Sequence, residues 1–400
     1  MTTVDAERFR NSPVGDVIPV SVYDRRDDQQ YNHFAFRARP LGHRIELSDG
    51  TIQAAMDASH ALGRLDQAAA QLPNPRLFIR PAIRKEAVST SALEGTFAGI
   101  AEIFEAELRE DASLTGDVRE VMNYVRAAER GVELLRSRPI GVNLLNTLQR
   151  TLVSGTRGDS YQAGGLRQEQ VWIGRRDARI TAARFVPCPH GDDLVKGVSD
   201  WEKWIHGIDE HGSDHDTPLL VRLAVGHYQF ETLHPYNDGN GRLGRLLIVL
   251  QLIEEKILRD PVLYVSPYFE ARRDEYVDHL RRVSETGDFD PWVNFFSKAV
   301  ATQAADASTR MGQVFNERDA IVAELRSKKV RGVAIEIAEN LIGFPIITPS
   351  QAAGAHGVSY QAANNAVGRL VDAGVLVELT GRTWGRVFAA PRLMRLLEVR

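Results

Sequence analysis

Hydrophobic residues recur every three or four positions along most of the chain, the spacing that places them on one face of a helix. This pattern predicts helices over residues 47–71, 81–93, 117–135, 140–153, 194–208, 217–232, 243–258, 270–285 and 291–328, the last as one long helix or two. The sequence therefore predicts a mainly α fold class.

Two regions depart from the helical pattern. Residues 170–174 and 180–186 are rich in β-branched and aromatic side chains and are separated by a charged, turn-like segment, so they predict a β-hairpin. Residues 1 to about 45 contain several prolines and a charged patch, and we expect an irregular arm there.

The last 70 residues have a pattern of their own. A change in composition around Arg326–Gly332 indicates a linker, and residues 330–400 then predict three helices, at 334–342, 349–355 and 359–373, and a hairpin at 375–388, which is typical of a winged helix-turn-helix domain. A helix that enters the major groove of DNA normally has basic neighbours that hold phosphates. The third helix and the hairpin offer Gln361, Asn364, Asn365, Arg369, Arg382 and Arg386. DNA binding and a docking or homodimerisation role both remain open.

Composition excludes several classes of protein. The 400 residues are 43% hydrophobic and 26% charged with a net charge of −4, so no global attraction to nucleic acid or to an anionic membrane is expected. The single Cys188 excludes an intramolecular disulfide and a multi-cysteine zinc site. Because the first residues lack the apolar core of a signal peptide and the longest apolar run is too short to span a bilayer, we expect a cytoplasmic protein without a membrane partner.

Candidate chemistry is concentrated in one stretch, His234-Pro-Tyr-Asn-Asp-Gly-Asn-Gly-Arg-Leu-Gly-Arg245, which predicts a loop between two buried helices. Gly239, Asn240 and Gly241 can direct successive N–H groups into one concavity at the positive end of the following helix, which makes an anion site. Arg242 and Arg245 lie three residues apart on one helix face, where both could grip further phosphate oxygens.

Two more residues of this stretch complete a phosphoryl-transfer site. Asp238 offers a carboxylate beside bound phosphates, the usual setting for Mg²⁺. His234 lies four residues earlier and could act as a general base on a hydroxyl. The glycine spacing also matches a dinucleotide fingerprint, but that motif follows a strand, whereas this one follows a helix. A solvated capping turn would leave His234 and both arginines without a role.

The stretch resembles the motif of the Fic family, His-x-Phe-x-Asp/Glu-Gly-Asn-Gly-Arg-x-x-Arg, with Tyr236 in place of the aromatic Phe. The resemblance implies AMPylation, the transfer of AMP from ATP to a protein hydroxyl, with His234 as base and Asp238 as Mg²⁺ ligand. It implies further that Gly239, Asn240 and Gly241 bind the nucleotide at the anion hole and that Arg242 and Arg245 hold its phosphates. Tyr276 resembles an aromatic position near the adenine and ribose, although core packing is an equal alternative for it.

A second motif lies in the predicted helix at about 81–95. Taken alone, Glu94 and Gly95 form an ordinary helix end. Beside a Fic core, Thr90-x-x-x-Glu94-Gly95 resembles the inhibitory motif of that family, and its position before the core implies autoinhibition from within the same chain. The implied mechanism is an ion pair between Glu94 and Arg245 that takes the place of the γ-phosphate and keeps resting activity low.

The predicted hairpin gains a role from the same resemblance. It is similar to the flap over the Fic active site, which binds the target's segment by strand addition, so Val171, Trp172, Ile173 and Gly174 are candidate target-binding residues. Gln149 occupies a position where relatives often carry a histidine, and we assign it no role.

Together these observations predict a Fic-type helical domain with a β-hairpin flap and a C-terminal winged helix-turn-helix domain. The expected division is an N-terminal helical region at 1–115, a Fic catalytic domain at 116–325 and a winged-helix domain at 330–400. The predicted function is that of a protein adenylyltransferase, a nucleotidyltransferase that modifies Ser, Thr or Tyr of a protein partner or of itself. Removal of AMP at the same site and an ATP-sensing transcriptional regulator are the alternatives.

Overall fold

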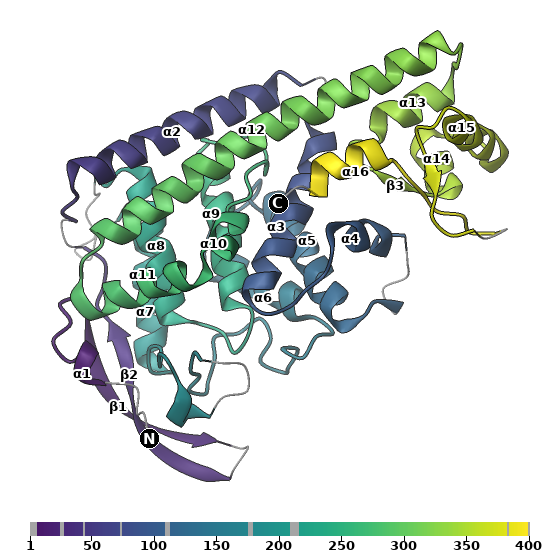
Figure 1. The fold of residues 1–400 in the computed structure, drawn as a ribbon. Helices are drawn as coiled ribbons and strands as arrows, with labels where there is room; N and C mark the ends of the chain where they lie inside the picture. Colours follow the sequence, from purple (N-terminus) through teal and green to yellow (C-terminus); the bar gives the residue numbers. More distant parts are fainter. Residues whose placement is uncertain are drawn as a thin grey trace. The chain divides into compact units, whose positions relative to one another are not determined.

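The computed structural model describes residues 6–24, 28–42, 45–72, 74–108, 113–174, 179–208, 216–381 and 384–398. Helices dominate these residues, as the sequence predicts, and the strands are few (Figure 1). The helices are α1 (Ala6–Phe9), α2 (Asp49–Ala70), α3 (Arg76–Leu93), α4 (Ile100–Ala106), α5 (Gly116–Leu134), α6 (Val142–Val153), α7 (Asp192–Ile205), α8 (Leu219–Leu233), α9 (Asn240–Glu254), α10 (Ser266–Ala271), α11 (Arg273–Thr286), α12 (Asp290–Ser327), α13 (Val333–Asn340), α14 (Pro349–His356), α15 (Tyr360–Asp372) and α16 (Pro391–Glu398). Within the described residues, no helix combines the length and hydropathy needed to cross a bilayer.

The chain folds into two compact units, each built from separate stretches of sequence. The first comprises Met1–Ala61, Arg126–Ile257 and Tyr268–Thr302, and the second comprises Leu62–Val125, Leu258–Pro267 and Gln303–Arg400. The domain boundaries expected from the sequence, near residues 115 and 325–330, stay predictions. All residues of the His234–Arg245 stretch belong to the first unit.

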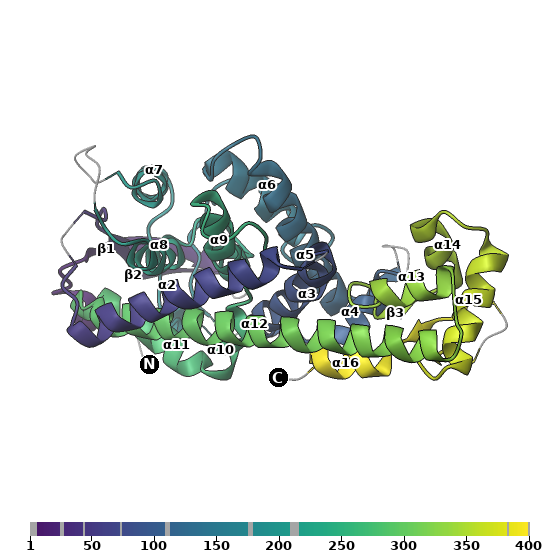
Figure 2. The ribbon, with the colours of Figure 1, turned by 90° about the horizontal axis from the view of Figure 1, so that it is seen from above.

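Two buried helices, α8 and α9, form the centre of the first unit and lie side by side (Figures 1 and 2). Nearly every residue of both helices is buried, which explains why their hydrophobic pattern is continuous around the helix. Gly244 permits their close approach, because a Cβ at this position would lie 2.6 Å from Glu231 Oε1 on α8. The helix pair therefore fixes the two ends of the loop between them.

The N-terminal arm is not irregular, and that expectation was wrong. Strands β1 (Gly15–Asp24) and β2 (Gln29–Ala38) form a ten-residue antiparallel hairpin that pairs Gly15 with Ala38 and Asp24 with Gln29. Residues around Phe36 alternate between the two faces of the strand, which is the pattern that indicates a strand. Phe36 is 3% exposed and packs against Phe9. Proline is tolerated within β1 because each strand of a two-stranded sheet is an edge strand.

The hairpin predicted at 170–186 was also wrong as a pair of regular strands. Ile173 and Phe185 form an isolated bridge, in which Ile173 N–H donates to Phe185 O at 2.8 Å, and Ile180–Ala182 forms a 3₁₀ turn. Residues 175–178, in the predicted turn, lie outside the described part. A hydrogen bond joins the segment to β2, since Phe36 N–H donates to Val186 O at 2.8 Å.

The C-terminal part of the second unit contains the three predicted helices, α13, α14 and α15. Thr348 and Gln351 form a capping box at the start of α14, and Ser359 caps α15. Strands β3 (Ile346–Ile347), β4 (Val377–Glu378) and β5 (Phe388–Ala389) form a small antiparallel sheet in the order β3-β5-β4. The winged-helix assignment and its DNA-binding role stay predictions, and Arg382 lies outside the described residues.

The buried His227 is expected to make the stability of the first unit depend on pH. The ring lies on α8 between Gly244 O, 3.2 Å from Nδ1, and the Tyr276 hydroxyl, 2.8 Å from Nε2. Burial, together with the nearby Arg245 charge, lowers the pKa of His227 to about 3. The neutral ring is therefore favoured in the folded state, and its contribution to stability is present above the ordinary pKa of 6.5 and is lost as the pH falls towards 3.

We expect the free energy of unfolding to fall between pH 7 and pH 5 by about 2 kcal/mol through His227, at 1.36 kcal/mol per pH unit below 6.5. Urea unfolding followed by tryptophan fluorescence at both pH values measures this loss. His227→Gln should have a shallower pH dependence than the wild type, and His60→Gln, at an exposed position on α2, serves as the control. Equal pH dependence in all three proteins would contradict the assignment.

Candidate active site

The loop between α8 and α9 begins and ends with left-handed backbone. His234, the residue after α8, has φ 49° and ψ 62°, and its N–H donates to Phe230 O at 2.9 Å. Gly239 has φ +83° and precedes the first residue of α9. A residue other than glycine is uncommon in this conformation, so His234 is held there by its surroundings. The two turns confine the predicted catalytic residues to one short loop.

Tyr236 and Asn240 close the interior of the loop. Asn240 Oδ1 accepts from Tyr236 N–H at 2.8 Å, and Asn240 Nδ2 donates to Tyr236 O at 2.7 Å. Tyr236 is fully buried, and its hydroxyl donates to Asn146 Oδ1 at 2.8 Å, which accounts for a tyrosine where the family motif has phenylalanine. The Asn240 side chain is therefore committed to the loop, and its backbone N–H is the group that remains for an anion.

The first turn of α9 has the features of an anion site. The N–H groups at the start of a helix have no acceptors within it, and the helix dipole adds positive potential there. Arg242 and Arg245 follow on the same helix and are 1% and 2% exposed. Two buried guanidinium groups beside a helix N-terminus strongly favour a bound polyanion.

Asp238 lies at the entrance to this turn. Its Oδ1 accepts from Gly239 N–H at 2.6 Å and lies 3.3 Å from Arg242 Nη2. The structure leaves little room on the other side, because a Cβ on Gly158 would lie 2.5 Å from Asp238 Oδ2. No cluster of three or more His, Cys, Asp or Glu side chains that could hold a metal occurs among the described residues. A single carboxylate fits Mg²⁺ that is held jointly with substrate phosphates.

The orientation of His234 suits a general base. Its Nδ1 lies 3.3 Å from the backbone oxygen of Glu231. A carbonyl oxygen only accepts hydrogen bonds, so Nδ1 carries the proton in this contact and Nε2 is the nitrogen that can take a proton from a substrate. The structure thus brings together His234, Asp238, Gly239, Asn240, Gly241, Arg242 and Arg245 on one loop and the helix that follows it.

Two buried residues that sequence reasoning missed hold this loop. Gln149 on α6 donates from Nε2 to Asp238 O at 3.0 Å and accepts from Gly164 N–H at 2.6 Å. Arg167 donates from Nε to His234 O at 2.8 Å. Both are 2% exposed. The glutamine is a polar residue within the apolar pattern of a helix, at a position where relatives often carry a histidine, and these were the signals available.

Tyr276 has surroundings that differ from those of the other site residues. Its ring stacks on Phe269 with centroids 4.7 Å apart and lies near Trp292, and its hydroxyl bonds to His227. At 4% exposed, it is part of a buried aromatic cluster. This arrangement favours the core-packing alternative, and nucleotide contact by Tyr276 stays a prediction.

The predicted inhibitory residues belong to the second unit, at the end of α3. Glu94 is the first residue after the helix and is exposed, Gly95 has the left-handed φ of +81°, and Thr90 is fully buried. Glycine is the residue that adopts this conformation without strain, so the helix end is encoded locally. The pairing of Glu94 with Arg245 stays a prediction.

The candidate flap residues 171–174 form an extended segment of the first unit. Ile173 is tied to Phe185, and Trp172 packs against a cluster of Ala35, Ala183 and Val186. The segment is therefore supported by β2 from within the same unit. Its role in binding a target stays a prediction.

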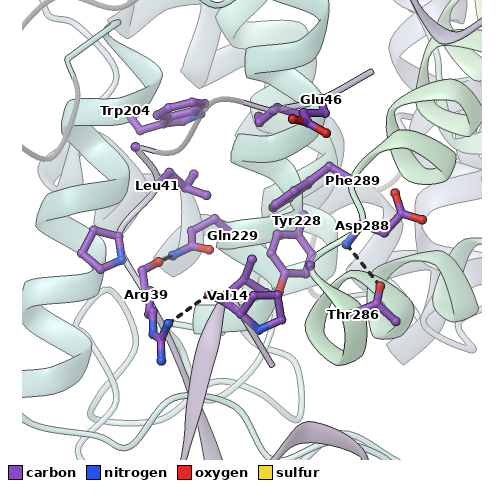
Figure 3. A pocket seen from close by; sticks show the side chains of 15 residues that line it. Val14, Arg39, Leu41, Glu46, Trp204, Tyr228, Gln229, Thr286, Asp288 and Phe289 are labelled. Atoms are coloured by element: carbon purple, nitrogen blue, oxygen red, sulfur yellow. Dashed lines mark hydrogen bonds between the residues drawn. The ribbon is translucent and has the colours of Figure 1, made fainter. Parts of the chain in front are cut away.

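A cavity of about 400 Å³ lies elsewhere in the first unit (Figure 3). Trp204, Tyr228 and Phe289 are among the side chains that line it, together with Gln229, whose amide donates to Arg39 O at 3.0 Å. None of the candidate site residues lines this cavity. Its size does not make it the site of the predicted chemistry.

Two adjacent family models match the chain. The Fic/DOC family N-terminal model matches residues 52–133, and the Fic/DOC family model matches residues 139–252, which include the whole His234–Arg245 stretch. The first match covers α3 and the second covers α8 and most of α9.

Similar proteins include enzymes named for AMP transfer. The chain is 26% identical over 174 residues to protein adenylyltransferase fic-1 of Caenorhabditis briggsae, covering 42% of this chain and 30% of that protein. It is 26% identical over 217 residues to protein adenylyltransferase Fic of Drosophila ananassae, covering 52% of this chain and 38% of that protein. The match thus spans well under half the length of these relatives.

A crystal structure of a Fic family protein from Desulfovibrio desulfuricans G20 has a similar fold. The two structures align with a TM-score of 0.54 over 87% of this chain and 98% of the other, at 19% identity. Taken together, the family models, the relatives and the shared fold show that the chain belongs to the Fic family.

Proposed function

We propose that the protein is an adenylyltransferase that transfers AMP from ATP to a Ser, Thr or Tyr hydroxyl of a protein. The names of the relatives and the donors at the start of α9 support ATP as the substrate. The hydroxyl oxygen attacks the α-phosphorus, the new O–P bond forms, and the bond to the bridging oxygen of the β-phosphate breaks. Pyrophosphate leaves, and the proton of the hydroxyl passes to His234 Nε2.

The candidate site residues have separate parts in this step. The N–H groups of residues 240–242 and the guanidinium groups of Arg242 and Arg245 would bind the phosphates, where charge is redistributed as the bond breaks. Asp238 would hold Mg²⁺ together with phosphate oxygens, and the cation would supply charge neutralisation. The Ile173 segment would position the target's backbone beside the loop.

One observation carries the proposal. Nδ1 of His234 faces the carbonyl of Glu231, and this contact makes the opposite nitrogen the proton acceptor. The proton acceptor, Nε2 of His234, therefore lies on the loop that leads into the anion site. One continuous stretch of chain supplies both the general base and the phosphate-binding donors.

We propose further that Glu94 restrains the enzyme by pairing with Arg245. An exposed carboxylate at the end of α3 is chemically able to replace a phosphate oxygen on a guanidinium group. Pairing would deny the γ-phosphate its arginine and leave ATP in an unproductive pose.

Replacement of His234 by alanine should reduce the rate of label transfer from α-³²P-ATP to protein by roughly 10²- to 10⁴-fold, the usual contribution of a general base. His60→Ala, at an exposed histidine, should transfer label at the parent rate. ATP binding measured by calorimetry should be retained in both variants. Label transfer by His234→Ala at the parent rate would remove the assignment of the base.

Replacement of Glu94 by glycine or glutamine should raise label transfer by about tenfold or more, because release of Arg245 restores a charge-assisted phosphate contact. Asp372→Asn, at an exposed acid at the end of α15, should leave the rate unchanged. Equal rates in the Glu94 variants and the wild type would contradict autoinhibition. Incubation of the wild type with the labelled product tests removal of AMP in the same assay.

A further inference from the structure

Arg167 is one of the largest fully buried side chains of the protein and belongs to the segment between α6 and the 3₁₀ turn. Burial lowers the pKa of its guanidinium group to about 10, so the group stays charged at neutral pH. A buried charge is costly unless hydrogen bonds satisfy it. The acceptors that satisfy Arg167 therefore indicate its role.

Three of its contacts lie at the end of α8. Arg167 Nε donates to His234 O at 2.8 Å and Nη2 donates to Leu233 O at 3.2 Å. Its backbone N–H donates to Pro235 O at 3.0 Å. The last carbonyl groups of a helix have no partners within it and carry the negative end of the helix dipole. The guanidinium cation thus binds the carbonyl groups of Leu233 and His234, and the backbone of the same residue binds that of Pro235.

Its remaining contacts lie on the segment that carries the candidate flap. Nη1 donates to Glu169 O at 3.2 Å, and Nη2 donates to Cys188 O. These two carbonyl groups flank residues 170–187, which include the Ile173 bridge. The planar guanidinium group therefore joins both ends of the flap segment to the backbone of His234.

We propose that Arg167 is a positioning residue that fixes the His234 imidazole relative to the flap. The inference rests on the proposed function, in which His234 is the base. The guanidinium group holds the carbonyl groups of Leu233 and His234, and the Arg167 backbone N–H holds that of Pro235, in the conformation that places Nδ1 against Glu231 O. It thereby sets which ring nitrogen carries the proton. Arg167 would then hold both the flap segment that binds the target and the loop that carries the proton acceptor.

Arg167→Lys is the direct test, because lysine keeps the positive charge but concentrates its donors at one point and cannot reach carbonyl groups on all sides. In the Glu94→Gly background, we expect kcat to fall by roughly 10- to 100-fold, the effect of a small misplacement of a catalytic group. The KM for ATP should change by less than about threefold, because the nucleotide contacts lie on α9.

Arg222→Lys is the matched control. Arg222 lies at the opposite end of α8, is largely buried and pairs with Glu255. The same substitution there should leave kcat at the parent value. A second variant, Arg167→Gln, removes the buried charge and its desolvation cost while keeping an amide donor, so it remains informative if Arg167→Lys does not fold. Thermal melting monitored by circular dichroism establishes which variants are folded.

A readout that needs no activity separates this proposal from the proposed function. The ¹⁵N chemical shifts of the His234 ring, assigned by comparison with His234→Ala, report which nitrogen carries the proton. We expect the Nδ1–H tautomer in the Glu94→Gly parent and in Arg222→Lys, and a mixture of tautomers in the folded Arg167 variants. An inactive parent would refute the proposed function but would leave this measurement valid.

Two results would overturn the positioning role. The first is a folded Arg167 variant with the parent kcat. The second is a folded Arg167 variant with a lowered kcat but an unchanged His234 tautomer, since the loss of kcat would then come from elsewhere. A fall in the fraction of active enzyme without a change in kcat per active site would assign Arg167 to stability alone.

Discussion

The reversal of the chain between α8 and α9 is the constraint on which the site depends. Both helices are buried and lie close together at Gly244, so the loop between them has little freedom. The loop receives the negative end of one helix and the positive end of the next. The negative end of α8 suits the proton acceptor His234 and the cation Arg167, and the positive end of α9 suits phosphate. The site of the base and the phosphate-binding site are thus separated by only a few residues of backbone.

Polar groups with demanding hydrogen-bond requirements hold this arrangement in place. Asn240 closes the loop from within, Gln149 binds the carbonyl of Asp238, and Arg167 binds the carbonyl of His234. An unsatisfied polar group in such surroundings is costly, so each contact resists displacement of the backbone. The left-handed conformation of His234 is stabilised by neighbours and not by its own preference.

The proposed regulation follows from the need of buried arginines for anionic partners. Arg242 and Arg245 are almost fully buried, and cations in that setting are stabilised by anionic partners. A carboxylate and a phosphate satisfy the same geometric requirement of a guanidinium group. An inhibitory acid therefore needs only to reach Arg245 to compete with ATP. Glu94 follows the last residue of α3 directly and precedes the left-handed Gly95.

The sequence by itself determined most of the helices, the mainly α fold class and the motif of the Fic family. These features are local, because helical periodicity and a motif of consecutive residues can be identified without knowing which distant segments pack together. The tertiary structure decided the β1–β2 hairpin, the single bridge at Ile173 and the aromatic surroundings of Tyr276. It also decided the contacts of Arg167, which join carbonyl groups up to 67 positions away. No local sequence pattern predicts such partners, because tertiary packing decides which distant segments form hydrogen bonds.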